Sequence, residues 1–219
     1  MRPPALNADI QNAAEATREI VDTEFEILGT NASSDDATIS TSGGVTIETD
    51  GADNDFVVIL PHLDASQSAW ATTLWDTAKS PSFETTIETG ASVASTEIWA
   101  GFKLTNVFLE TTDDDQAYFF YDSVTTSWKF ITSRAGTDTI YTVPLDICPA
   151  VAASTLYRLR IEVYSDRTCM GFINDRPIRA TNFAALTSLT TLKPYVGVMA
   201  AAAAAKKITV KYIEVGRAL

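Results

Sequence analysis

The 219-residue chain is acidic, with a formal net charge of −12 and a pI near 4.4. This balance argues against nucleic-acid binding, because proteins that bind phosphate backbones collect lysine and arginine, and the 16 basic residues here are scattered. The sequence lacks a run of roughly 18 apolar residues and has no apolar core of a signal peptide near its amino end. It therefore predicts a soluble protein that is made in the cytoplasm and does not enter a membrane.

Residues 1–29 are predicted to form a partly helical N-terminal arm. Asn7 suits an N-cap, and apolar side chains that include Ile10, Ile20 and Val21 recur at helical spacing. Such a thin apolar stripe is unstable alone in water, so we expect the arm either to lie on the folded domain or to dock on a neighbouring subunit, with preference for the second. Small polar residues follow, and the remaining chain, 30–219, is predicted to be one domain.

Beyond residue 36 the sequence consists mainly of short strand signals separated by turns. Strands are predicted at 37–41, 45–49, 56–60, 70–75, 81–88, 97–104, 116–122, 126–132, 139–143, 194–199 and 206–215, with two more within 156–173. The run of alanines at 200–205 is interpreted as the end of a strand and a tight turn. Roughly a dozen short strands at this spacing predict an all-β, two-sheet antiparallel sandwich of the jelly-roll type.

The segment from Leu156 to Ile173 carries the clearest structural signal. Apolar and polar residues alternate strictly from Tyr157 to Tyr164, which is the pattern of a strand with one buried and one wet face. Ser165 and Asp166 interrupt the pattern, and a second strand ends at the polar turn after Ile173. The unit is predicted to be an antiparallel hairpin.

Several segments resemble concanavalin-like (laminin-G-like) sandwich domains and, more narrowly, structural proteins of tailed phages. The first likeness rests on the strand YRLRIEV at 157–163, the turn GFIND at 171–175 and the segment LKPYVGV at 192–198. The second rests on IWAGFKLTN at 98–106, DDQAYF at 114–119 and the same KPYVGV run. The resemblance covers about residue 30 to the end, and none of its motifs is catalytic.

This resemblance implies a virion component that decorates or reinforces a capsid, or serves in a fibre or tail. Its partners would be capsid or other virion proteins, and the chain itself would form a homo-oligomer, with a trimer favoured. The N-terminal arm would be the natural tether. An acidic surface suits an exposed particle protein that must not adhere to nucleic acid.

An alternative function is a carbohydrate- or receptor-binding module of a tail fibre or a secreted lectin-like protein. If the strands at 81–88 and 97–104 pair, one outward face would carry the residues Glu84, Glu88, Glu97, Trp99 and Lys103. An exposed tryptophan beside carboxylates is a surface on which a sugar ring stacks. The competing interpretation, which we favour, is that Trp99 packs under a loop or against a neighbouring subunit.

An enzymatic function is not favoured. Hydrolases among concanavalin-like sandwiches carry Glu-x-Asp-x-Glu on one strand, and the nearest match here, from Glu84 to Glu88, has Thr86 at the central position. The Cα atoms of the two glutamates would lie about 13 Å apart at ~3.3 Å per residue. This exceeds the ~5–9.5 Å carboxyl separations of known mechanisms.

The remaining candidates for special chemistry have simpler interpretations. Asp113, Asp114 and Asp115 lack the spacing of a calcium loop and are predicted to form a solvated hairpin turn. His62 is the single histidine, so no multi-histidine metal site is expected. Cys148 and Cys169 are predicted to be buried free thiols. We expect neither a metal nor a cofactor.

Overall fold

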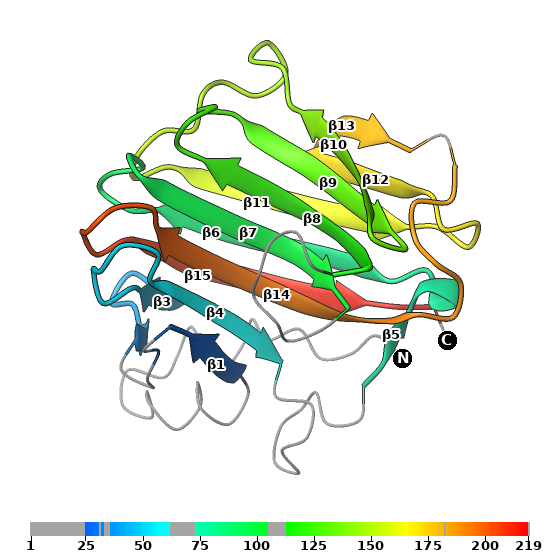
Figure 1. Cartoon of the computed structure of the whole chain (residues 1–219), viewed down its shortest axis with the longest axis horizontal. Helices are drawn as coiled ribbons and strands as arrows, with labels where there is room; N and C mark the ends of the chain where they lie inside the picture. The colour runs from blue at the N-terminus through cyan, green and yellow to red at the C-terminus, as the bar shows by residue number, and fades with distance from the viewer. Residues whose placement is uncertain are drawn as a thin grey trace.

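The computed structural model describes residues 25–30, 32, 36–61, 73–104, 113–181 and 183–218. Within this part of the chain, two antiparallel sheets pack face to face, as the sequence predicted. Figure 1 is viewed with sheet A in front of sheet B. None of the helical segments in the described ranges is both long and apolar enough to span a bilayer.

In spatial order, sheet A contains β1 (Phe25–Gly29), β4 (Phe56–Pro61), β14 (Thr191–Ala200), β7 (Thr96–Lys103), β8 (Asp115–Asp122), β9 (Trp128–Arg134) and β10 (Thr137–Thr142), with β5 (Trp75–Asp76) beside β14. Sheet B contains β13 (Arg176–Ala180), β12 (Cys169–Ile173), β11 (Leu156–Val163), β6 (Ser82–Thr89), β15 (Lys207–Gly216), β3 (Val45–Glu48) and β2 (Ala37–Ile39). A short 3₁₀ helix, Thr77–Lys79, follows β5.

Alternating side chains build the core between the sheets. In β6, Phe83, Thr85 and Ile87 are fully buried while the residues between them are partly exposed, as the sequence predicted. Aromatic rings join the two sheets: Trp128 of β9 meets Tyr157 of β11 edge to face, with ring centroids 5.6 Å apart. Burial of these large apolar side chains is the main driving force for the sandwich.

The predicted hairpin is confirmed, because β11 pairs with β12 in antiparallel register. β8 also pairs with β9, and β2 with β3, each in antiparallel register. β14 ends at Ala200, and 201–204 bend back toward β15, so the alanine run is the strand end and turn that was predicted. The backbone there packs against neighbours, since the amide of Ala201 donates to the carbonyl of Ser95.

The predicted arm needs correction at its carboxyl end. Phe25–Gly29 forms β1, which pairs with β4 along five residues, because its apolar side chains have a sheet edge to cover. The sandwich therefore includes residues that were assigned to the arm. Residues 1–24, with Ile10, Ile20 and Val21, lie outside the described ranges, and the helical arm has no support from the structure.

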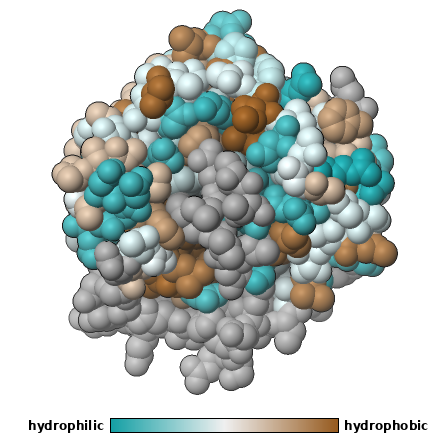
Figure 2. Space-filling view, in the orientation of Figure 1, coloured by the Kyte–Doolittle hydropathy of each residue, from teal (hydrophilic) through white to brown (hydrophobic). Residues whose placement is uncertain are grey.

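The two outer faces of the sandwich differ in character. On sheet A, side chains that alternate with the core form a second buried apolar cluster, made of Val58, Leu60, Trp99, Tyr118, Phe120, Ile131 and Tyr195. In Figure 2, viewed from this side, the visible coloured residues mix hydrophilic and hydrophobic types without one large apolar area. The outer face of sheet B carries charged side chains instead, and it contains the site described next.

Candidate functional site

A polar cleft of about 430 Å³ lies on the outer face of sheet B. Its lining comprises Ser82, Phe83, Glu84, Arg158, Arg160, Glu162, Asp175 and Glu214. These residues come from β6, β11 and β15, together with the turn between β12 and β13. The volume lies in the range of small-ligand sites.

Strand register brings the charged side chains together. Glu84 on β6 stands opposite Arg160 on β11 and opposite Glu214 on β15. One row further along, Thr86 stands between Arg158 and Tyr212. Directly opposite residues in antiparallel strands have Cβ atoms about 4.5–5.5 Å apart, so each row forms a line of interacting side chains.

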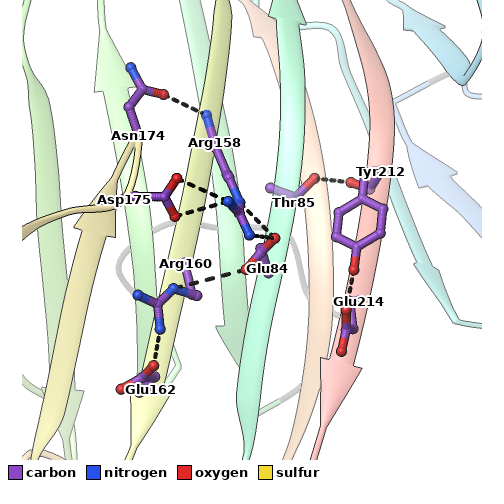
Figure 3. Close-up of polar contacts among 9 residues, drawn as sticks. All are labelled: Glu84, Thr85, Arg158, Arg160, Glu162, Asn174, Asp175, Tyr212 and Glu214. Carbon is purple, nitrogen blue, oxygen red and sulfur yellow. Dashed lines mark hydrogen bonds and ion pairs between the residues drawn. The ribbon is translucent and has the colours of Figure 1, made fainter. Parts of the chain in front are cut away.

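Glu84 is the centre of the ion-pair network (Figure 3). Its Oε1 accepts from Nε of Arg158 at 2.8 Å and lies 2.7 Å from Nη2 of the same guanidinium. Its Oε2 lies 3.9 Å from Nε of Arg160, which also pairs with Glu162. The Glu84 side chain is only 16% exposed, so these arginines compensate for much of the hydration that its carboxylate has lost.

Arg158 also ties the β12–β13 turn to the cleft. Its Nη1 donates to Asp175 at 2.9 Å, and its backbone amide donates to the side-chain oxygen of Asn174. Asn174 and Asp175 have φ values of 50° and 64°, the left-handed backbone that such tight turns require. The hydrogen bond with Glu84, with the charges of Glu84 and Asp175, raises the pKa of Arg158 against the opposing effect of burial.

Aromatic groups flank the charged row on both sides. The Arg160 guanidinium carbon lies 3.7 Å from the ring centroid of Phe172, a cation–π contact that fixes the guanidinium plane. On the other side, the Tyr212 hydroxyl donates to Glu214. A bulge in β15 between Val210 and Tyr212 re-aims these residues, so Tyr212 points away from the core.

The predicted shared face of the strands at 81–88 and 97–104 does not form. β6 belongs to sheet B and β7 to sheet A, so Glu84 and Glu88 lie on one outer face, whereas Glu97, Trp99 and Lys103 belong to the other sheet. Strict alternation specifies which side of a strand is buried but not which sheet the strand joins.

Trp99 and Lys103 are both buried. That a loop or a neighbouring subunit covers Trp99 stays a prediction. Trp99 is 2% exposed and stacks on Phe120 with ring centroids 5.7 Å apart. The Lys103 ammonium lies 3.9 Å from an Asp113 carboxylate oxygen and 5.2 Å from the ring centroid of Tyr195. These two side chains form no exposed platform for a sugar.

Glu84 and Glu88 are also separated in their contacts. Glu88 pairs with Lys211 at 2.9 Å and does not line the cleft, whereas Glu84 is bound by the two arginines. The pair is therefore not arranged as a two-carboxylate catalytic site. The alternation at 157–164 predicted Arg158, Arg160 and Glu162 to point outward, but alternation within one strand does not indicate that they lie beside Glu84 or Glu214.

The aspartate run is not the solvated turn that was predicted. Asp113 and Asp115 are 3% and 5% exposed, because each accepts hydrogen bonds from backbone amides: Asp113 from Leu104, and Asp115 from Thr187. No group of three potential metal-ligating side chains gathers anywhere in the described ranges. His62 lies outside those ranges.

Both cysteines are buried free thiols, as predicted. Burial raises the pKa of Cys169 to about 12, with a further contribution from the Asp166 charge. Burial also raises the pKa of Cys148, against the opposing charge of Arg176. High pKa values leave few thiolates at neutral pH, so neither residue has the character of a reactive nucleophile.

No family model and no curated protein matches the chain. Several solved structures are similar to it: the carbohydrate-binding module CBM66 from Bacillus subtilis is 10% identical over 89% of this chain and 96% of its own, with a TM-score of 0.52. A β-glucanase from Bacillus licheniformis is 8% identical over 89% and 92%, with a TM-score of 0.62. An alginate lyase from Pseudomonas aeruginosa is 12% identical over 85% and 87%, with a TM-score of 0.58.

At these identities the likeness shows the fold alone, a concanavalin-like, jelly-roll sandwich. The three proteins comprise a binding module and two enzymes, so the fold does not decide between binding and catalysis. The virion role that the resemblance implied, with its capsid partner and location, receives no support from these comparisons.

Proposed function

We propose that the chain is a carbohydrate-binding module that holds a neutral, hydroxyl-rich glycan in the cleft on sheet B. The observation that carries the proposal is the mutual fixation of Glu84, Arg158 and Arg160 at the floor of an open cleft. Guanidinium groups supply planar hydrogen-bond donors, and carboxylates supply several acceptor positions. Neighbouring hydroxyls on a sugar ring match such paired donors and acceptors. Because the side chains hold one another in place, little conformational entropy would be lost on binding.

The charge of the cleft favours a neutral glycan over a polyuronate. Four carboxylates and two guanidinium groups line it, so negative charge is in excess, as it is over the whole chain. A ligand with a carboxylate on every sugar would be repelled. The cleft therefore suits a different ligand from the substrate named for the similar alginate lyases.

The contacts of Glu84 favour binding over catalysis. A carboxylate that acts as a nucleophile or as a general acid needs an oxygen directed at the substrate. Both oxygens of Glu84 face guanidinium groups, and Glu162 is engaged by Arg160 and by the Tyr164 hydroxyl. This arrangement resembles a rigid hydrogen-bonding surface more than an acid–base pair.

Titration calorimetry of the full chain against neutral and acidic oligosaccharides tests the proposal. We expect saturable binding of at least one neutral oligomer, weaker binding of an alginate oligomer, and no cleavage of either during prolonged incubation. Glu84→Gln removes the charge that organises both arginines, so glycan affinity should fall about tenfold or more.

Glu48→Gln is the matched control. Glu48 lies on β3 in the same sheet, is 47% exposed at its side chain and pairs with Lys207 at 3.8 Å, outside the cleft lining. Equal losses in both variants, or saturable binding that survives Glu84→Gln, would contradict the assignment of the site. Release of shortened or unsaturated sugars by the wild-type chain would show that the chain is an enzyme and would contradict its assignment as a binding module.

A further inference from the structure

The strand β10, Thr137–Thr142, borders sheet A with one open edge. Among the described residues it pairs only with β9. Its outward side chains are exposed, including Ile140 at 60%. On its inner side, Tyr141 packs partly against the core. The guanidinium carbon of Arg179 on β13 lies 5.3 Å from the centroid of the Tyr141 ring. β10 is therefore a well-supported strand whose second row of backbone hydrogen-bonding groups faces outward.

The neighbouring border strand of sheet B has several features that prevent further pairing, whereas β10 has a single charged residue, the exposed Asp138. Figure 1 shows β13 and β10 at the same side of the sandwich. β13 contains Pro177, which has no N–H, and flanking arginines, and its ladder with β12 is interrupted by a bulge. These are the features by which edge strands avoid unwanted association. The segment TDTIYT of β10 has no proline, lysine or arginine.

We propose that β10 pairs with β10 of a second copy of this chain, antiparallel, about a twofold axis through Ile140. In this register Ile140 meets Ile140, Thr139 meets Tyr141 and Asp138 meets Thr142. In this register, two residues that stand opposite each other are always an even number of positions apart in the sequence. Outward side chains therefore meet outward side chains, and edge-facing backbone groups meet edge-facing backbone groups.

Other registers are less favourable. Moving the axis to Thr139 places Asp138 opposite Ile140, which sets a carboxylate against the exposed apolar side chain. Placing the axis midway between two consecutive residues pairs side chains from opposite faces of the sheet, which a continuous sheet does not allow. The register centred on Ile140 covers the apolar side chain and separates the two Asp138 carboxylates, so the edge is self-complementary.

The charge of the chain predicts how this dimer responds to salt. Each copy carries a formal charge of −12, so the two copies repel at low ionic strength. Salt screens that repulsion but affects the backbone ladder and the Ile140 contact little. We expect the dimer to become tighter as salt is added. The inference does not rest on glycan binding, because β10 lies in the other sheet from the cleft.

Sedimentation velocity of the full chain, from low micromolar to several hundred micromolar and at low and high salt, measures this association. Ile140→Lys sets two ammonium groups against each other at the axis and should raise the dimer dissociation constant at least about tenfold. Val124→Lys is the matched control, because Val124 is 90% exposed in the turn between β8 and β9 and is not part of β10.

A second measurement locates the contact directly. Ile140→Cys should give a covalent dimer with a short bismaleimide linker, whereas Val124→Cys should not, and the two native thiols are buried. A wild-type chain that remains monomeric at the highest concentration and salt would overturn the proposal. An oligomer that tolerates Ile140→Lys, or equal cross-linking at both positions, would overturn it as well.

Discussion

Replacement of Arg158 by lysine separates the role of its charge from the role of its shape. Arg158 directs Nε and Nη2 to Glu84 at 2.8 and 2.7 Å and Nη1 to Asp175 at 2.9 Å. A lysine ammonium keeps the charge but cannot reach both carboxylates with a fixed planar fork. The 44% exposure of the Arg158 side chain lets solvent screen these ion pairs. The free energy of unfolding should therefore fall by less than about 1 kcal/mol.

The effect on binding should be larger than the effect on stability. A loss of less than ~1 kcal/mol corresponds to a decrease of less than about 4 °C in Tm for a chain of this size. Loss of one or two charge-assisted hydrogen bonds to a glycan, each worth about 1.5–3 kcal/mol, should weaken binding about tenfold or more. Calorimetric unfolding and glycan titration on the same samples measure both quantities.

Arg134→Lys is the control for this prediction, since Arg134 is an exposed arginine of β9 in the other sheet, where it donates to a backbone carbonyl. Unchanged glycan affinity in Arg158→Lys would refute the reasoning. A parallel loss in Arg134→Lys would refute it too, because the effect would then not depend on the cleft.

Three further predictions follow from buried groups. Cys148 and Cys169 should resist a thiol reagent at neutral pH in the folded chain and react fully in urea, because burial raises both pKa values; rapid labelling of the native protein would contradict this. In Gly171→Ala, the added Cβ would lie 3.2 Å from aromatic ring atoms of β8 and β9, so urea unfolding should show a loss of about 1–3 kcal/mol, and an unchanged midpoint would count against it. Burial opposes ionisation of Asp122, but hydrogen bonds led by that of Lys129 outweigh it and lower its pKa below the ordinary 3.8. The stabilising effect of the ionised carboxylate is therefore complete at neutral pH and is lost as the pH falls below that value. Thermal unfolding of Asp122→Asn should differ most from wild type near neutrality and converge with it in acid, and a constant difference would exclude the linkage.

The sequence was sufficient to predict most strands because alternation is a local property. In β6 and β11 it correctly separated buried from outward residues, and the turn residues at 165–166 located the β11–β12 hairpin. Sheet membership is not local. β6 and β7 are consecutive and both alternate, yet β6 pairs with β11 and β15 while β7 pairs with β8 and β14.

The cleft depends on this long-range pairing, which explains why it was not predicted as a unit. Glu84 reaches Arg158 across 74 residues of sequence, and Glu214 comes from the last strand. The outward positions of Glu84, Arg158 and Arg160 were correctly predicted, and opposite charges on two outward faces were the one available signal that β6 and β11 are neighbours. The chemistry of the site was visible in the sequence, but its assembly was not.

The burial of the sheet A outer face shows a different limit of alternation. Every residue of β8 is buried, because Tyr118 and Phe120 on one side of the strand pack as closely as Phe119 and Tyr121 on the other. An apolar run of this kind indicates a strand that is covered on both faces, not one half-wet strand.

The contrast between the two outer faces decides where ligand binding is physically reasonable. On sheet A, Trp99 and its neighbours already bury their apolar surface, so a ligand there would have to displace aromatic packing worth several kcal/mol by the usual cost of exposing such side chains. On sheet B, the polar groups of Arg158 and Glu84 remain in contact with solvent in an open cleft, and a sugar would replace water without disturbing the core. A tryptophan in the sequence is the residue that most readily suggests sugar stacking. In this fold Trp99 is structural, and under the proposed function the ion-paired arginines on the opposite sheet are the groups that would recognise the sugar.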